Sequence, residues 1–165
     1  MARSSAELSY RTLEPPWESA LALFSFAGAW APAADRVADG WGAWQDEILC
    51  GALLAERAGA SAMLHGPVVV TPPDAPGDSA IEIAGHLVAQ ALERAPLERI
   101  DTLFTRPQAL DRIWVRAGFI PVPEAELPSP LRNRPGVGLF GWRGGTALWS
   151  AAGRGASRPR SLGAR

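Results

Sequence analysis

The stretch that decides the fold of this chain is SAMLHGPVVVTPPDAPGDSAIEI, residues 61–83. It opens with an apolar run that is typical of a buried strand, and Gly66-Pro67 interrupts that run in its middle. Proline cannot donate a hydrogen bond to a neighbouring strand, and both residue types belong at bulges. The stretch therefore predicts a strand over 61–71 whose pairing is broken halfway along by a bulge.

A loop and a long helix follow the bulged strand. The proline-rich composition of residues 72–77 is typical of a loop. Asp78 and Ser79 are favourable helix caps, and Ser79 with Glu82 matches a capping box. Apolar residues then repeat at helical spacing as far as Pro96. This pattern predicts a helix that begins at the two caps and ends at the proline.

The patterns on either side of this stretch predict further strands and helices. Before it we expect strands over 8–13, 41–45 and 48–55, a helix over 17–27, a short helical piece over 34–40 and a hairpin turn over 56–59. After the long helix we expect a strand over 99–105, a helix over 107–117 capped by Gly118, and strands over 119–122 and 137–142. The chain contains no internal repeat.

The composition fits one globular domain. The chain has 165 residues, of which 47% are hydrophobic and 20% charged, and this hydrophobic fraction excludes a disordered chain. Cys50 is the single cysteine, which excludes a disulfide scaffold and fits a reducing compartment. All 16 basic residues are arginine, so chemistry that needs a lysine, such as a Schiff base or a Walker-type phosphate loop, is excluded.

The charge is unevenly distributed along the chain. Residues 1–150 carry 12 Arg against 17 acidic residues, a net charge of −5, which is a poor match for nucleic acid. Residues 151–165 carry four Arg and no acid, and they lack the apolar periodicity of a packed element. We therefore expect one domain over 1–150 and a basic, disordered tail over 151–165; the alternative for the tail is an arm that contacts an anionic partner.

A possible targeting segment lies near the N-terminus. Residues 19–34 are uncharged and end in small residues that resemble a signal cleavage site. The flank before them holds three Glu and two Arg, whereas a secretory signal requires a positive flank. The segment is also shorter than the ~18 apolar residues of a membrane-spanning helix. We therefore expect a buried helix here, no membrane association and a cytoplasmic protein.

The order of these elements resembles the GCN5-related N-acetyltransferase (GNAT) superfamily across roughly residues 6–145. Gly66-Pro67 falls where this family carries a bulge in its fourth strand, and that strand runs through Val70-Thr71-Pro72 into a glycine-containing loop and a helix. Residues 114–119, WVRAGF, look like the family's helix-to-strand ending. The resemblance implies an α/β fold with a mixed, mostly antiparallel sheet that is splayed at the fourth and fifth strands and flanked by helices.

The resemblance also implies an activity, a cofactor and a binding site. It implies an N-acetyltransferase that moves an acetyl group from acetyl-CoA to a primary amine on a small molecule or peptide. In the family the pantetheine arm enters the splay as a pseudo-strand, and the pyrophosphate rests on the N-terminus of the following helix. Here this implies pantetheine contacts from Val68, Val69 and Val70, and pyrophosphate contacts from Gly77, Asp78, Ser79, Ala80 and Ile81.

The sequence departs from the family pattern at two places. The phosphate loop has Ala75 where the family usually has Arg or Gln, and Asp78 where it has Gly, while Ala80 matches. The late helix has Trp114 where many members have the Tyr that protonates the leaving thiolate, and an indole is not a useful proton donor. These departures leave two alternatives open. One is a catalytically inactive GNAT-fold binding or structural module, and the other is an unrelated α/β fold with a hydrolytic site.

Few residues are candidates for a general base. His65 stands just before the bulge, and histidine accepts protons in the neutral pH range; the alternative is a histidine with a purely structural role. Asp101 on the fifth strand and Glu47 are further candidates, each with a structural alternative. His86 lies in the long helix, where we expect it to pack or to face solvent.

Tryptophans from the first third of the chain are candidates for an acceptor pocket. Trp30, Trp41 and Trp44 come from the region that builds the acceptor side in the family, and simple core packing is the alternative. The two His and one Cys are widely spaced, so we expect no metal site. The last strands of this fold often lie at a dimer interface, so a homodimer is a further expectation.

Overall fold

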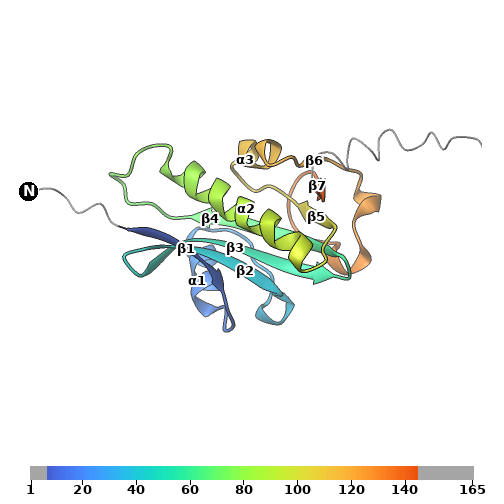
Figure 1. Ribbon diagram of the computed structural model, residues 1–165, viewed down its shortest axis with the longest axis horizontal. Coiled ribbons are helices and arrows are strands. Elements are labelled where there is room, and N and C mark those ends of the chain that lie inside the picture. The colour runs from blue at the N-terminus through green and yellow to red at the C-terminus, as the bar shows by residue number, and fades with distance from the viewer. Residues whose placement is uncertain (1–6, 145–165) are drawn as a thin grey trace, which may run out of the picture.

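The computed structural model describes residues 7–144, which form one seven-stranded sheet with helices on both faces (Figure 1). The strands lie in the order β1-β2-β3-β4-β5-β7-β6, and each neighbouring pair is antiparallel except β4 with β5. The expected mixed, mostly antiparallel sheet is therefore confirmed. The elements are β1 (Leu8–Leu13), α1 (Glu18–Phe26), η1 (Ala34–Arg36), β2 (Asp39–Gln45), β3 (Ile48–Ala58), β4 (Ser61–Val69), α2 (Ser79–Leu97), β5 (Thr102–Thr105), α3 (Asp111–Arg116), β6 (Ile120–Pro121), η2 (Glu124–Glu126), η3 (Ser129–Leu131) and β7 (Phe140–Arg143).

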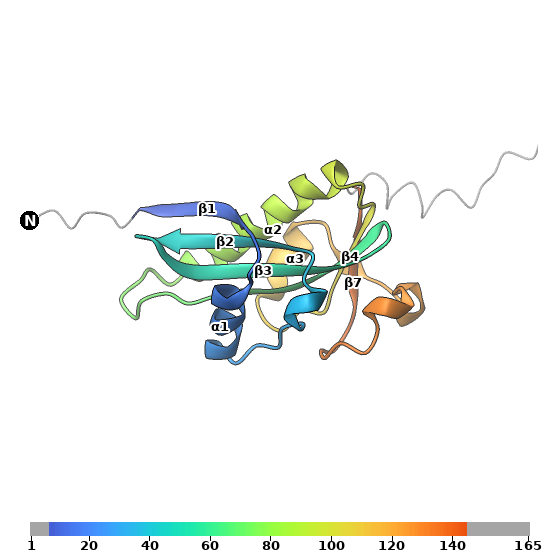
Figure 2. The same cartoon turned by 90° about the horizontal axis from the view of Figure 1, so that it is seen from below.

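The sheet has a hydrophobic core on each face, because successive strand residues point to opposite sides. Figure 2 shows α1 and α2 on opposite sides of the strands. Leu53 of β3 belongs to the core under α2 and α3, whereas its neighbour Leu54 packs with Phe24 of α1. A third cluster lies under the 3-10 segments and contains Met63, Phe104, Leu127, Leu131 and Leu139.

Strand β3 is longer than its apolar run indicates. The hairpin turn expected over 56–59 is wrong, because β3 continues to Ala58 and the turn is formed by Gly59 and Ala60. Gly59 has a φ of +59°, the left-handed conformation that a tight turn requires. Glu56 is consequently a strand residue, and it points to the same face as Leu54.

The bulge and the splay of β4 are confirmed. Ala52 pairs with Val68 and Leu54 with His65, so Gly66 and Pro67 together oppose the single residue Leu53. Gly66 has a φ of +97°. The parallel pairing of β4 with β5 runs from Ser61 only to Leu64 and ends just before the bulge. Beyond this point β4 continues to Val69 without a neighbour on its β5 side.

The helix ends differ from expectation at two places. The capping box is absent, because Asp78 takes the N-cap position of α2 and makes no side-chain cap hydrogen bond. Pro96 does not end the helix either: α2 continues to Leu97, and Arg99 then takes a left-handed conformation with the Ile100 N–H donating to the Ala95 carbonyl. The expected strand over 99–105 therefore begins only at Thr102.

The cap of α3 is confirmed, but the helix is short. Gly118 has a φ of +94°, and Phe119 N–H donates to the Trp114 carbonyl at 3.0 Å, as in a Schellman motif. The helix expected over 107–117 begins only at Asp111, after Leu110 with a φ of +60°. The short helical piece expected over 34–40 is the 3-10 turn η1, and Asp39 already belongs to β2.

Two further expectations concern the whole chain. The predicted tail over 151–165 and the domain boundary near residue 150 lie outside the described residues. Among the helices of residues 7–144, none combines the length and the apolar character that crossing a membrane requires.

Candidate active site

A cleft of about 360 Å³ opens where β4 leaves β5. The end of α1 lines it from one face of the sheet, and Ala80 in the first turn of α2 lines it from the other. Beside the cleft, the loop after α1 contacts the loop after β5. The backbone N–H of Trp30 donates to Gln108 Oε1 at 3.3 Å. The lining residues are 27–29, 66–69, 80 and 108–110.

The edge of β4 facing this cleft has unpaired backbone groups. Val70 N–H donates to the Cys50 carbonyl at 2.8 Å, so the backbone groups of Val70 point toward β3. Because these directions alternate along a strand, Val69 N–H and C=O point away from β3 into the splay, and those of Val68 point back to β3. Of the three valines expected to meet a pantetheine arm, Val69 alone offers it backbone groups, while Val68 and Val69 line the cleft.

The N-terminus of α2 has free donors beside the same cleft. Ser79 N–H donates to the Pro76 carbonyl and Glu82 N–H to the Asp78 carbonyl, while Ala80 and Ile81 N–H have no acceptor among the described residues. Such donors and the helix dipole favour an anion. The carboxylates of Asp78 and Glu82 oppose this preference because they put negative charge on the same turn.

His65 lies directly before the bulge and is almost fully buried. Its exposed fraction is 5%, and its Nε2 is 2.7 Å from Glu56 Oε2 on the neighbouring strand β3. The Trp30 ring meets the imidazole edge-on, with ring centroids 5.1 Å apart. The expected base therefore stands at the splay, with a carboxylate on one side and an aromatic ring on another.

Glu56 is held between His65 and an arginine from a distant part of the chain. Arg134, in the segment between η3 and β7, donates from Nε to Oε2 at 2.8 Å and from Nη2 to Oε1 at 2.7 Å. Burial raises the pKa of Glu56, but the hydrogen bonds from Arg134 and His65 outweigh burial and lower this pKa to about 2. Glu56 is therefore ionised throughout the physiological pH range.

Several residues expected at the site lie elsewhere. Asp101 is exposed at the start of β5, where its N–H donates to Ala60 at the end of the sheet opposite the splay, so it cannot reach the cleft. Trp41 packs in the core under α2, on the other face from Glu56. Trp44 lies beneath Arg11, whose guanidinium carbon is 4.2 Å from its ring centroid. Of the three tryptophans, Trp30 alone contacts His65.

The remaining polar candidates also lie apart from His65. Glu47 pairs with Arg11 on the surface. His86 stacks on Tyr10 with ring centroids 3.9 Å apart, on the face that carries α2. Trp114 is fully buried against Phe119, and its Nε1 has no hydrogen-bond partner among the described residues. The late helix therefore places an apolar ring where the family resemblance implied a proton donor.

Sequence reasoning missed Glu56, Arg134 and Gln108. Glu56 continues the period-two pattern of Ala52 and Leu54, and this signal was hidden because Glu56-Arg57 stands just before Gly59 and reads as a turn. Arg134 and Gln108 lie in loops without periodicity, and their contacts with the site depend on tertiary structure.

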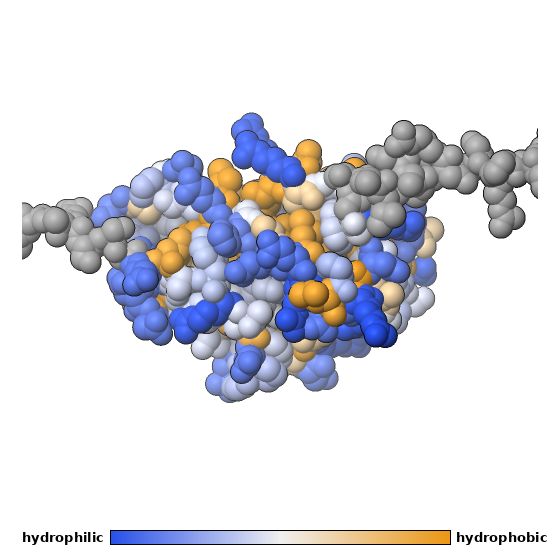
Figure 3. Space-filling model, viewed as in Figure 1, coloured by the Kyte–Doolittle hydropathy of each residue, from blue (hydrophilic) through white to orange (hydrophobic). Residues whose placement is uncertain are grey.

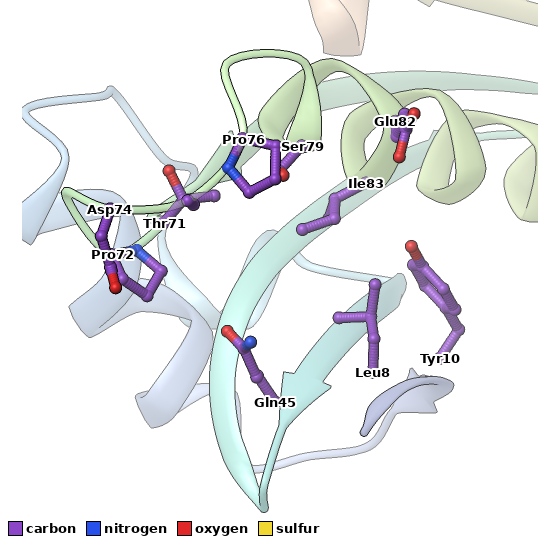
Figure 4. A pocket seen from close by; sticks show the side chains of 11 residues that line it. Leu8, Tyr10, Gln45, Thr71, Pro72, Asp74, Pro76, Ser79, Glu82 and Ile83 are labelled. Atoms are coloured by element: carbon purple, nitrogen blue, oxygen red, sulfur yellow. The ribbon is translucent and has the colours of Figure 1, made fainter. Parts of the chain in front are cut away.

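A second cavity, of about 470 Å³, lies between β1, β2 and the loop that leads to α2. Figure 4 shows Leu8, Tyr10 and Gln45 on one side of it and Thr71, Pro72 and Asp74 across from them. It shares the N-terminus of α2 with the splay, through Ser79 and Glu82, but contains none of the bulge residues.

Apolar residues also reach the surface on the face that carries α2 and α3 (Figure 3). A groove of about 380 Å³ lies between these two helices and begins at Ile81, next to the free donors of the first turn. Its apolar lining comes from Ala89 and Leu92 of α2 and Ile113 of α3. The groove thus adjoins the N-terminus of α2.

Comparison with known proteins gives a clear structural result. No family model and no curated protein sequence matches the chain. A GNAT-family acetyltransferase from Staphylococcus aureus Mu50 aligns over 84% of this chain and 100% of its own, with a TM-score of 0.63 and 11% identity. N-acetylglutamate synthase from Neisseria gonorrhoeae, complexed with coenzyme A and N-acetyl-glutamate, aligns over 85% of this chain and 36% of its own, with a TM-score of 0.62 and 17% identity.

A third similar structure is the ribosomal-protein-S18-alanine N-acetyltransferase from Escherichia coli. It aligns over 83% of this chain and 94% of its own, with a TM-score of 0.59 and 13% identity. At such low identity the agreement concerns the path of the backbone alone. The chain therefore has the fold of the GCN5-related N-acetyltransferase superfamily.

Proposed function

We propose that this protein is an acetyl-CoA-dependent N-acetyltransferase that acts at the splay between β4 and β5. The observation that carries the proposal is the cleft itself, which is lined by Val69, with its free backbone groups, and by Ala80, whose free N–H belongs to the first turn of α2. The buried His65 directly precedes Gly66, which lines this cleft, and its imidazole meets the ring of Trp30. We propose a primary amine, on a small molecule or peptide, as the acceptor.

The residues present suit the pantetheine arm better than the pyrophosphate. Val69 offers one N–H and one C=O to an extended amide chain, the pattern by which a peptide adds to a sheet edge. Ala80 and Ile81 offer two N–H groups to an anion, with Asp78 and Glu82 nearby. We therefore expect binding that depends mainly on the splay and is weakened by the acidic first turn.

The chemistry divides between the bound cofactor and the chain. When bound, acetyl-CoA supplies an activated acetyl thioester and a thiol leaving group. His65 takes the proton that the attacking amine loses as the C–N bond forms and the C–S bond breaks. Solvent returns a proton to the leaving sulfur, because the indole of Trp114 is not a useful acid. The products are an acetylated amine and free coenzyme A.

A calorimetric titration of acetyl-CoA into the full chain tests this proposal. We expect saturable binding that Gly77→Glu weakens about tenfold or more, because the new carboxylate would repel the pyrophosphate. Gly77 is exposed and no atom lies within 4 Å of a Cβ added there, so both variants should fold. Gly77→Gln is the matched control of similar size without charge, and we expect it to bind nearly as the wild type does.

Two outcomes would count against the proposal. The absence of binding at millimolar acetyl-CoA would overturn it. Binding without release of free thiol in the presence of a panel of primary amines would favour a catalytically inactive module instead. The fully buried Trp114 in place of a proton donor is the observation that favours this second function.

A further inference from the structure

His65, Glu56 and Arg134 form a buried chain of charged and polar groups from three parts of the fold. His65 belongs to β4, Glu56 to β3, and Arg134 to the segment between η3 and β7. The exposed fractions of the His65 and Glu56 side chains are 5% and 3%, and that of Arg134 is 14%. Such a chain contributes little net stability compared with apolar side chains of equal volume. Its position beside the bulge therefore invites a functional explanation.

We propose that Glu56 and Arg134 are positioning residues that fix His65 in the tautomer with a proton on Nε2, so that Nδ1 is the atom that accepts the proton from the acceptor amine. This inference rests on the proposed function, since it assigns roles within the same site.

The tautomer follows from the partner of Nε2. An ionised carboxylate has no proton to donate, so Glu56 Oε2 accepts and His65 Nε2 donates across their 2.7 Å contact. In a neutral imidazole the other nitrogen then carries the lone pair. Among the described residues nothing is hydrogen-bonded to Nδ1, so no donor of the described protein competes for its lone pair.

Arg134 offsets the charge of the carboxylate that faces the imidazole. A buried carboxylate without a partner cation favours the charged form of a neighbouring imidazole, which could not act as a base. The Arg134 guanidinium is always charged, binds both carboxylate oxygens and offsets their charge. Two further donations, from Nη1 to the Arg132 carbonyl and from Nη2 to the Pro130 carbonyl, hold the guanidinium in this position.

The other groups that contact His65 do not compete with this arrangement. Trp30 presents its ring to the imidazole and carries no charge. Its ring centroid also lies 6.0 Å from the guanidinium carbon of Arg134, so Trp30 lies close to both His65 and Arg134. The charged groups facing His65 from the packed elements are therefore Glu56 from β3 and Arg134 from the segment before β7.

Nitrogen-15 NMR of the imidazole in the full chain tests the tautomer directly. At neutral pH we expect a neutral ring protonated on Nε2 in the wild type. In Glu56→Gln the amide oxygen can keep the place of Oε2, where it accepts from both His65 Nε2 and Arg134 Nε, so the tautomer should persist. In Glu56→Leu no acceptor remains for Nε2, so the preference for a proton on Nε2 should be lost. A wild-type ring that is protonated on Nδ1, or charged at neutral pH, would overturn the proposal without recourse to any variant.

The pH dependence of kcat/KM separates positioning from a structural role. We expect Glu56→Leu to lower kcat by about tenfold or more at every pH, because His65 loses the acceptor that fixes its proton on Nε2, and Glu56→Gln, which keeps an acceptor there, to retain more activity. We expect Arg134→Met to move the acidic limb of the profile to higher pH, because protonation of His65 becomes more favourable, and to recover its rate there. Glu98→Gln, which breaks the surface pair with Arg94, is the control and should leave the profile unchanged.

The outcomes distinguish this inference from the proposed function. If acetyl-CoA binds and amines are acetylated, but Glu56→Leu and Arg134→Met keep the wild-type profile, the positioning roles are wrong while the proposed function stands. If acetyl-CoA does not bind, the proposed function is wrong, and the proton-acceptor role of Nδ1 falls with it. The NMR measurement still decides whether Glu56 sets the tautomer.

Discussion

At the scale of single residues, Glu56 is the least ordinary side chain in the described part of the protein. It is a carboxylate with an exposed fraction of 2%, and it accepts hydrogen bonds from the His65 ring and the Arg134 guanidinium. These partners lower its pKa from 4.5 to about 2, although burial alone would raise it. The unfolded chain therefore binds a proton at Glu56 more readily than the native protein does, which links stability to pH.

We expect this linkage to appear in acid. A carboxyl group with a lowered native pKa stabilises the fold fully above its unfolded pKa and loses that contribution as the pH falls toward the native value. For Glu56 the window runs from pH 4.5 down to about 2, and the contribution is about 3 kcal/mol, of which about 2 kcal/mol is lost by pH 3.

Urea denaturation at pH 7 and pH 3 measures this contribution. The difference in unfolding free energy between the wild type and Glu56→Gln should shrink by about 2 kcal/mol between the two pH values. Glu47→Gln, at an exposed carboxylate that pairs with Arg11 on the surface, is the control for general acid effects. A difference for Glu56→Gln that stays constant with pH would contradict the buried, ionised state.

The single residues differ in how far sequence can identify them. His65 could be identified from the sequence because it stands beside Gly66-Pro67, the strongest local signal in the chain. Glu56 could not be identified in this way, because a Glu-Arg pair near a glycine matches a turn as well as a strand end. Its carboxylate can be buried only because it pairs with Arg134, which lies 78 residues further along the chain. Asp101 lies away from the bulge, because parallel pairing places the start of β5 beside the start of β4.

At the scale of elements, the bulge in β4 is the feature that creates the site. A Cβ at Gly66 would lie 3.0 Å from the Phe24 ring and from the Val68 nitrogen, and the φ of +97° disfavours any side chain there. Gly66 thus connects the packing of α1 to the path of β4 as that strand leaves β5. The strand sequence produces a cleft because glycine and proline interrupt it at this point.

Gly66→Ala tests this connection. We expect it to lower the free energy of unfolding by about 2–4 kcal/mol, from backbone strain together with the contacts made by the new methyl group, and to weaken acetyl-CoA binding. Gly59→Ala is the matched control, since Gly59 also has a positive φ of +59° but nothing lies within 4 Å of its added Cβ. We expect a loss of about 1 kcal/mol there and unchanged binding. Equal losses in the two variants would show that the bulge carries no special constraint.

Element type was more predictable than element length. Strand β1 spans Leu8–Leu13, the residues predicted for it, although its side chains are exposed or half-buried without alternation. The ends of α2 and β3 were predicted wrongly, because the chain ends these elements through backbone conformation at Arg99 and Gly59. A left-handed arginine gives no signal in composition, so Pro96 looked like the end of the helix.

At the scale of the whole molecule, topology gathers the site from distant segments. The cleft takes residues from the end of α1, the bulge of β4, the first turn of α2 and the loop after β5. The order of elements was enough to predict this meeting place, because the fold type sets which strands separate. The second cavity, beside β1 and Tyr10, was not predicted, since it depends on how the loop over residues 71–76 folds back toward β1 and β2 (Figure 4).

Amide hydrogen exchange at Val69, measured by NMR with and without acetyl-CoA, tests the central claim most directly. If the pantetheine arm pairs with the free edge of β4, exchange of the Val69 N–H should slow by about tenfold or more on binding. Exchange of the Gln45 N–H, beside the second cavity, should not change. Protection at Gln45 without protection at Val69 would place the ligand in the other cavity and contradict the account.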